Sequence, residues 1–167
     1  MRTKRPPRLA GFDYLGFYRY FLTICTEGRR PIFEDVVAGR QVIDHFLQHA
    51  QACSFAVSAY CLMPDHLHAL VKGTTVDANF KQFVRGWKQR SAYEWKQRIG
   101  ERLWQEGYYD RVLRAEEADL WVISYIASNP VEAGLVESPE EYPLFGSAEY
   151  SWSEIRLALE ELEPWMS

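Results

Sequence analysis

Two histidines stand one residue apart in a stretch of the chain that could bind a metal ion. The stretch reads L-M-P-D-H-L-H-A-L-V-K-G over residues 62–73, with His66 and His68 at the start of a strand-like run. Residues i and i+2 of a strand point to the same face, so the two imidazoles would lie side by side. A shared metal ion or a shared anion is the simplest way to satisfy two desolvated imidazoles. The alternative is that each is an ordinary core histidine, and we assign Asp65 to the turn after Pro64.

The other two of the four histidines, His45 and His49, are spaced i and i+4 in a segment with a helical pattern. They could therefore face one another. No further residue of a ligand type lies nearby in the sequence to complete a metal site. We interpret His45 and His49 as surface or rim residues.

A tyrosine and an asparagine four residues apart could supply a nucleophile and a further ligand. Tyr125 and Asn129 lie in W-V-I-S-Y-I-A-S-N-P, whose pattern predicts a helix, so they share a face of it. A tyrosine hydroxyl can attack a phosphodiester when a metal ion withdraws charge from the phosphate oxygens. The carbonyl oxygen of Asn129 could then be a third metal ligand beside His66 and His68. The alternative is a half-buried core tyrosine, with Asn129 capping the end of the helix.

These residues need a scaffold of alternating strands and helices, which the pattern of hydrophobic residues predicts. Strands are expected at residues 17–26, 54–62, 66–71 and 109–113, and helices at residues 35–52, 75–99, 116–129 and 153–162. We expect Pro130 and Gly134 to end the third helix, and residues 142–150 to be irregular. The short connection between the second and third strands makes them an antiparallel hairpin. This order predicts an α+β fold, a ferredoxin-like antiparallel sheet with helices packed on it.

The composition is that of a soluble globular protein. The 167 residues are 47% hydrophobic and 25% charged, and we expect a single domain over residues 1–167. The three cysteines lack C-x-x-C spacing, which argues against a disulfide framework or a zinc knuckle. No apolar run approaches the roughly 20 residues that span a membrane, and the N-terminus lacks the apolar core of a signal peptide. We therefore expect a cytoplasmic protein with no membrane partner.

Positive and negative residues are divided unevenly along the chain. All but one of the 19 Lys and Arg residues precede residue 115, whereas more than half of the 23 acidic residues follow it. This division predicts a body that can bind phosphates, with a basic arm at residues 1–10. It also predicts an acidic tail at residues 146–167, which either solvates the surface or competes for the basic patch.

Basic and aromatic side chains could together bind an unpaired nucleic-acid strand. The basic candidates are four residues of the arm and a stripe on the long second helix: Arg2, Lys4, Arg5, Arg8, Lys81, Arg85, Lys88 and Lys96. The candidates for stacking on bases are Trp104, Tyr108 and Tyr109. Basic side chains neutralise phosphates, and aromatic rings stack on bases of any kind. Each of these aromatic residues could instead belong to the core.

Three motifs resemble those of the one-tyrosine HUH transposases, in particular the REP-associated tyrosine transposases of bacteria. They are, in order, M-P-D-H-L-H-A-L-V, L-W-Q-E-G-Y-Y-D-R-V-L-R and Y-I-A-S-N-P-V-E-A-G-L-V, and the resemblance extends over residues 17–145. It implies the HUH fold, a divalent metal, Mg²⁺ or Mn²⁺, bound by His66 and His68, and Tyr125 as the catalytic nucleophile. Related insertion-sequence transposases carry a glutamine ligand where this chain has Asn129.

The resemblance implies a metal-dependent enzyme that cleaves single-stranded DNA at hairpins and rejoins it. Tyr125 would form a covalent 5′-phosphotyrosine and release a 3′-hydroxyl, in a monomer or a homodimer that acts on DNA of the bacterial nucleoid. Mn²⁺ suits imidazole ligands better than Mg²⁺, which prefers oxygen. Two other functions compete with this one. They are a non-catalytic single-stranded nucleic-acid-binding module of the same fold, and a metal phosphodiesterase that activates water and in which Tyr125 is structural.

Overall fold

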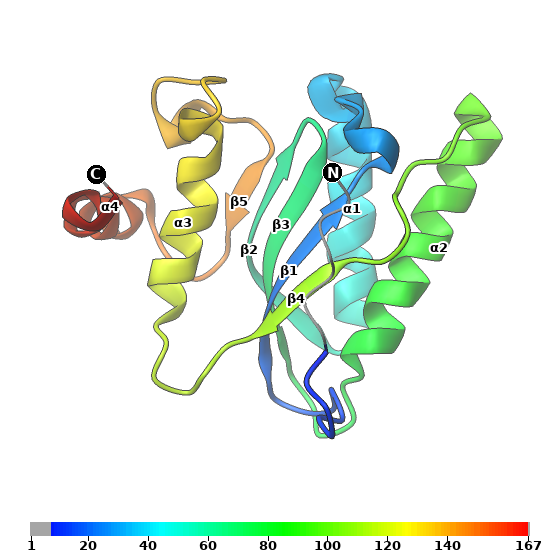
Figure 1. Ribbon diagram of the computed structural model, residues 1–167, viewed down its shortest axis with the longest axis horizontal. Coiled ribbons are helices and arrows are strands. Elements are labelled where there is room, and N and C mark those ends of the chain that lie inside the picture. Colours follow the sequence, from blue (N-terminus) through cyan, green and yellow to red (C-terminus); the bar gives the residue numbers. More distant parts are fainter. Residues whose placement is uncertain (1–7, 167) are drawn as a thin grey trace.

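One antiparallel sheet forms the centre of the structure, a computed structural model that describes residues 8–166 (Figure 1). Its strands are β1 (Arg19–Cys25), β2 (Phe55–Met63), β3 (His66–Gly73), β4 (Tyr109–Val112) and β5 (Phe145–Ser147). Their order across the sheet is β4-β1-β3-β2-β5, so β3 is the central strand. Both of its neighbours run antiparallel to it, and β2 and β3 form the predicted hairpin.

Helices cover the two faces of the sheet unequally. Helices α1 (Val36–Ala52) and α2 (Phe80–Ile99) pack on one face, and α3 (Asp119–Glu132) packs on the other, with α4 (Trp152–Met166) against α3 (Figure 1). Helix α3 lies over β2 and β3, which leaves β4 and part of β1 without a helix on that face in the described residues. The predicted α+β class is confirmed. No helix among residues 8–166 is long and apolar enough to cross a membrane.

Residues of β3 alternate between the two faces of the sheet. Leu67 and Ala69 are fully buried in the cluster beneath α1 and α2, whereas Leu70 belongs to the cluster beneath α3. His66 and His68 share the face of Leu70, because side chains two residues apart in a strand point the same way. The alternation therefore directs both imidazoles to the partly open face.

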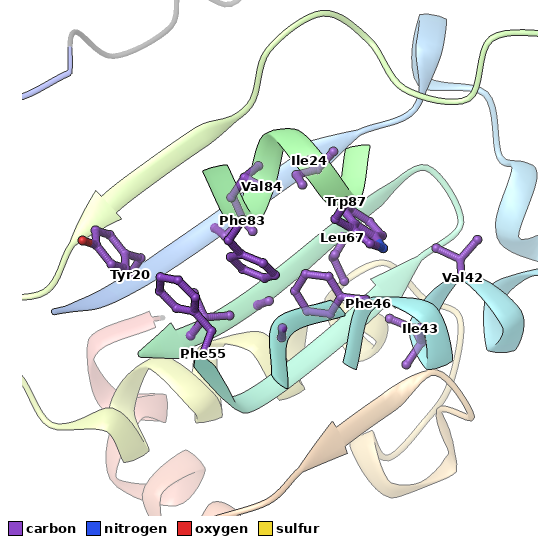
Figure 2. Packing of buried hydrophobic residues seen from close by; sticks show 14 of the residues in the cluster. Tyr20, Ile24, Val42, Ile43, Phe46, Phe55, Leu67, Phe83, Val84 and Trp87 are labelled. Atoms are coloured by element: carbon purple, nitrogen blue, oxygen red, sulfur yellow. The ribbon is translucent and has the colours of Figure 1, made fainter. Parts of the chain in front are cut away.

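Aromatic side chains fill the cluster beneath α1 and α2 (Figure 2). Phe46 of α1 packs edge to face against Trp87 of α2, with ring centroids 4.9 Å apart. Phe83 of α2 stacks on Phe55 of β2 with ring centroids 4.8 Å apart. Full burial of a side chain of this kind stabilises the fold by roughly 1.5–3 kcal/mol. This face of the sheet is thus an aromatic core that supports the strands bearing the histidines.

Several helix boundaries differ from those predicted, among them the start of α2 and the two ends of α3. Helix α2 begins at Phe80 rather than at residue 75, because the Asn79 side chain caps it by accepting a backbone N–H of its first turn at 3.0 Å. Helix α3 continues through Pro130 into its last turn, so the expectation that Pro130 ends it is wrong. Proline lacks a backbone N–H, so it removes one hydrogen bond from a helix. A helix can therefore continue for a few residues past a proline that lies near its end. Gly134, with φ of +71°, follows the helix end as predicted.

The C-terminal acidic segment is folded onto the body. Residues 142–150 are not wholly irregular, because β5 pairs with the edge of β2. Ile155 and Ala158 of α4 are buried, and Ile155 belongs to the cluster beneath α3. Residues 146–161 thus contribute side chains that pack on the body of the protein.

Candidate active site

His66 and His68 converge at the start of β3. Their Nε2 atoms are 3.1 Å apart, and their ring centroids are 4.5 Å apart with an angle of 79° between the planes. In the β1–β3 register His66 lies opposite Cys25, and His68 lies opposite Thr23. The prediction that the two imidazoles lie side by side is confirmed.

The other nitrogen of each ring is held by a neighbouring oxygen. His66 Nδ1 lies 2.7 Å from Asp65 Oδ1, and His68 Nδ1 lies 2.9 Å from Thr23 Oγ1. An ionised carboxylate only accepts hydrogen bonds, so His66 donates from Nδ1 and keeps a lone pair on Nε2. The Thr23 hydroxyl oxygen can accept the Nδ1 hydrogen of His68 in the same way. Asp65 therefore does more than shape the turn, because it orients an imidazole.

Burial keeps both imidazoles neutral. It lowers the pKa of His68 to about 3, and it lowers the pKa of His66 although the hydrogen bond to Asp65 opposes this. Burial alone would raise the pKa of Asp65, but the contacts with His66 and Arg29 outweigh it and lower that pKa. Neutral imidazoles with a carboxylate behind one of them are the form in which histidines bind metal ions.

The donor set of this pair fits a divalent cation that accepts nitrogen ligands. When both neutral rings donate from Nδ1, each Nε2 carries a lone pair, and the two Nε2 atoms are 3.1 Å apart. A cation bound by both lone pairs would stabilise this arrangement. Within residues 8–166 no group of three His, Cys, Asp or Glu side chains could hold a metal ion. The pair would therefore supply two ligands of these kinds and leave further positions to water or to oxygens of a substrate.

Helix α3 presents Tyr125 to the histidine pair. Ile126, the next residue, is buried in the cluster beneath α3, whereas Tyr125 is 46% exposed. The Tyr125 ring centroid is 6.3 Å from that of His68 and 6.0 Å from that of Phe21. Phe21 in turn stacks on His68 with ring centroids 5.2 Å apart. Tyr125 is thus about half exposed, and its ring borders the histidine pair.

Asn129 lies one turn beyond Tyr125 on α3. Its Nδ2 donates to the backbone carbonyl oxygen of Tyr125 at 2.8 Å, which ties the amide to its own helix. No hydrogen bond among the described residues joins Asn129 to His66 or His68. The role of Asn129 as a third ligand stays a prediction.

Two residues of β4 lie on the same face as the histidines. In the β1–β4 register Tyr109 is opposite Thr23, and Arg111 is opposite Phe21. Directly opposed residues of antiparallel strands place their side chains on one face, and Thr23 contacts His68 there. Tyr109, a predicted DNA contact, therefore lies on the partly open face beside the site. Arg111 is exposed on the same face, and sequence reasoning missed it.

The predicted basic stripe lies on the other side of the sheet. Its residues all belong to α2, in the layer opposite α3 (Figure 1): Lys81, Arg85, Lys88 and Lys96. Lys88 Nζ donates to the carbonyl oxygens of Gln105 and Gly107 at 2.9 and 2.5 Å. Lys81 Nζ lies 4.7 Å from the ring centroid of Tyr14. The stripe does not border the histidine pair, so a DNA strand that touched both would have to pass around the β4 edge.

Two of the predicted stacking residues pack into the protein. Trp104 is 4% exposed and its Nε1 donates to Ser91 Oγ at 2.9 Å, so the prediction that it stacks on a base is wrong. Tyr108 is partly buried, 6.1 Å from the ring of Phe80, and the guanidinium of Arg8 lies 5.0 Å from its ring centroid. The remaining arm residues lie outside the described part of the chain: Arg2, Lys4 and Arg5.

The second histidine pair lies between α1 and α2, far from the first. His45 is exposed, and its Nδ1 is 2.9 Å from Glu94 Oε2 of α2. His49 Nε2 is 3.1 Å from the Phe83 carbonyl oxygen. The interpretation as surface or rim residues is confirmed for His45, which is exposed, and His49 is partly buried and contacts α2.

Comparisons with known sequences identify the family. The family model described as "Transposase IS200 like" matches residues 17–129, more than half of the chain. A Haemophilus influenzae protein named as a candidate REP-associated tyrosine transposase is 26% identical over 141 residues, which cover 74% of this chain and 76% of that protein. An uncharacterised protein of the same organism is 21% identical over 165 residues, which cover 77% of this chain and 88% of that protein.

Solved structures share the fold. A REP-associated tyrosine transposase bound to a REP hairpin has a TM-score of 0.69 at 18% identity, covering 86% of this chain and 82% of its own. A candidate transposase from Deinococcus radiodurans has a TM-score of 0.52 at 23% identity, covering 64% of this chain and 87% of its own. The predicted HUH transposase fold is thereby confirmed. The family match spans both histidines of the pair and Tyr125, and the chain belongs to the IS200-like transposase family.

Proposed function

We propose that the protein is a transposase that cleaves single-stranded DNA beside a hairpin and rejoins it through a covalent bond to Tyr125. The observation that carries this proposal is the exposed Tyr125 ring 6.3 Å from the ring of the buried His68. Membership of the IS200-like family supports it, and so does the REP hairpin bound by the REP-associated structural relative.

The proposed reaction exchanges one phosphoester bond for another. The Tyr125 hydroxyl oxygen attacks the phosphorus and the bond from phosphorus to the 3′ oxygen breaks. The DNA fragment downstream of the cut stays joined to Tyr125 through its 5′ phosphate, and the upstream fragment leaves with a 3′-hydroxyl. The phenolic proton passes to solvent, and the released 3′ oxygen takes up a proton. Attack by a 3′-hydroxyl of another DNA end reverses these steps. No external energy source is needed, because the number of phosphoester bonds is unchanged.

His66 and His68 would hold a divalent cation, Mg²⁺ or Mn²⁺, with Asn129 as the further ligand predicted from the motif. When bound, the cation would withdraw charge from the oxygens of the scissile phosphate. The chain contributes the orientation of both Nε2 atoms, which the contacts of Nδ1 with Asp65 and Thr23 fix. Two imidazole ligands favour Mn²⁺ over Mg²⁺.

A single chain carries the nucleophile and both histidines. The ring contact between Tyr125 and His68 forms within one polypeptide, which supports cleavage by a monomer. A homodimer would not be required for this step. DNA as the partner would make the nucleoid, within the bacterial cytoplasm, the place of action.

A denaturing gel tests the proposal by detecting DNA that stays bound to the protein. The protein is incubated with Mn²⁺ and labelled hairpin oligonucleotides whose single-stranded flanks are randomised. We expect an SDS-resistant adduct with the wild type and none with Tyr125→Phe. Tyr93→Phe, which removes the hydroxyl of an exposed tyrosine of α2, is the matched control and should give wild-type adduct. Cleavage without an adduct would favour a water-activating phosphodiesterase, and binding without cleavage would favour a non-catalytic module.

A further inference from the structure

Arg29 lies beside the histidine pair, at the end of the short 3₁₀ segment Glu27–Arg29 that follows β1. Its Nε donates to Asp65 Oδ2 at 2.9 Å, and its Nη1 donates to Cys25 Sγ at 2.8 Å. The other carboxylate oxygen of Asp65 is 2.7 Å from Nδ1 of His66. One carboxylate therefore separates the guanidinium from an imidazole of the pair.

The guanidinium of Arg29 keeps unused donors. Its side chain is 52% exposed, and Nη2 makes no hydrogen bond within the described residues. Arginine presents its N–H groups in a planar fork, so part of the fork can be fixed by the protein while the rest faces a ligand. A guanidinium already held at two nitrogens has less freedom to lose when it binds an oxyanion.

The backbone at Arg29 is strained. Its φ is +56°, in the left-handed region that favours glycine, and the preceding Gly28 has φ of +64°. Non-glycine residues held in this region cluster at functional sites, where the surrounding structure fixes them. At Arg29 the turn brings the side chain back against Cys25 and Asp65, which hold it in place.

The charges around Arg29 favour an anionic ligand. Among the described residues Asp65 is the acidic side chain that pairs with Arg29, and Asp65 is shared with His66. A divalent cation at the histidine pair would leave this corner of the site with excess positive charge. A phosphodiester offsets that charge, and the additional negative charge of the transition state offsets it further. Guanidinium groups match phosphate oxygens in geometry as well as in charge.

We propose that Arg29 contacts a nonbridging oxygen of the scissile phosphate through Nη2 and stabilises the charge that develops there when Tyr125 attacks. This inference rests on the proposed function and assigns it a further catalytic residue. The competing role is purely positional, with Arg29 acting only by holding Asp65 against His66.

The salt dependence of DNA binding tests the phosphate contact without requiring cleavage. Titrations of a fluorescent dT oligonucleotide in EDTA give the slope of log K against log salt concentration. Arg29→Gln should reduce the magnitude of this slope by about 0.7, the value for one phosphate contact on a single strand, and Arg29→Lys should restore it. Arg30→Gln is the matched control. It removes the same charge from the next residue, whose guanidinium binds Glu101 and the Arg102 carbonyl oxygen, and should keep the wild-type slope. An unchanged slope in Arg29→Gln overturns the proposal.

A Mn²⁺ titration separates the phosphate contact from the positional role. Free Mn²⁺ is followed by electron paramagnetic resonance, with no DNA present. A purely positional Arg29 would make Arg29→Gln lose roughly 10–100-fold in Mn²⁺ affinity at an unchanged salt slope, and this result would overturn the proposal. We expect wild-type Mn²⁺ affinity together with the reduced slope.

The adduct assay then links Arg29 to the chemistry. At saturating Mn²⁺, Arg29→Gln should slow adduct formation by about 100-fold, and Arg29→Lys should recover part of the rate. A wild-type rate in Arg29→Gln would refute a catalytic role. The proposed function fails separately: a wild type that forms no adduct refutes it, while a reduced salt slope in Arg29→Gln would still support the phosphate contact. Tyr125→Phe should form no covalent adduct with DNA and should keep the wild-type slope of log K against log salt concentration.

Discussion

The ring of Tyr125 lies 6.3 Å from the ring of His68, although one residue belongs to a helix and the other to the central strand of the sheet. Phe21 completes this contact, since it meets Tyr125 edge to face and stacks on His68. The buried side of α3 fixes the helix on the sheet. The phenol is therefore held beside the imidazoles by the core of the protein, before any substrate binds.

Replacing His66 by alanine should abolish specific Mn²⁺ binding, because a single imidazole would remain at the site. The free Mn²⁺ signal in a titration measures this. His45→Ala is the control, since it removes an exposed histidine that pairs with Glu94 on the opposite side of the sheet. Wild-type binding by His66→Ala would show that the pair is not the metal site.

Asp65→Asn should weaken Mn²⁺ binding by about 10–100-fold. The amide oxygen is a weaker acceptor than the carboxylate for Nδ1 of His66, and the lost charge makes the imidazole a poorer ligand. Asp77→Asn serves as the control, because Asp77 accepts a hydrogen bond from Thr75 in an exposed loop. Equal affinities of the two variants would contradict the role assigned to Asp65.

His68 should make the metal-free protein less stable in mild acid. The folded pKa of about 3 lies below the ordinary value of 6.5, so below pH 6.5 the unfolded chain binds a proton that the folded chain does not. The free energy of unfolding therefore declines as the pH falls from 6.5 towards 3. At about pH 5.5 the expected loss is roughly 1 kcal/mol relative to neutral pH. Urea unfolding of the wild type and His68→Gln at both pH values measures it, and equal losses in the two proteins would contradict it.

Removing charge from α4 should change DNA affinity little. Helix α4 packs against α3, away from the basic residues of α2, and exposed charges are screened within about 8 Å at physiological salt. The double variant Glu160→Gln and Glu161→Gln changes two exposed side chains and leaves the core intact. Titration with a dT oligonucleotide should give an affinity within about twofold of the wild type. A gain of tenfold would instead support the alternative that the acidic segment competes for the basic surface.

Deleting residues after Phe145 is expected to destabilise the protein rather than activate it. The deletion removes most of β5 and the buried side chains of Ile155 and Ala158. Removing a large side chain from the core lowers the free energy of unfolding by several kcal/mol, of the order of 2–5 kcal/mol for an isoleucine. Thermal unfolding measures the loss, and an unchanged midpoint would show that α4 contributes nothing to stability.

The geometry of the histidine pair was predictable because it is local. Two residues of one strand are related by the pleat alone, and the hydrophobic run after His68 marks the strand. The i, i+4 relation of Tyr125 and Asn129 is local in the same sense. Placing Tyr125 beside His68 required more, and that came from the resemblance of the motifs to a known family rather than from spacing.

Thr23, Arg29 and Arg111 could not be predicted in the same way. Thr23 meets His68 only through the register of β1 against β3, and Arg111 reaches the same face through the register of β1 against β4. Register depends on the packing of the whole sheet. Arg29 reaches Asp65 through a left-handed turn, and a glycine before it in the sequence gives only a general indication of a turn.

The basic stripe on α2 shows a different limit. Periodicity correctly separates the face with Phe83 and Trp87, which is buried, from the face with Lys81 and Arg85. It does not tell which layer of the fold a helix joins. Trp104 shows the same limit, because a loop tryptophan packs into the core or stays exposed according to contacts that are remote in sequence.

Because side chains alternate along β3, the position of the two histidines depends on the register of β3 against β1. If the strand slipped by one residue against β1, Leu67 and Ala69 would turn towards α3, and both imidazoles would enter the aromatic layer under α1 and α2. A mutation that keeps the register of β3 against β1 thus also keeps both histidine side chains on the face of the sheet that α3 covers in part.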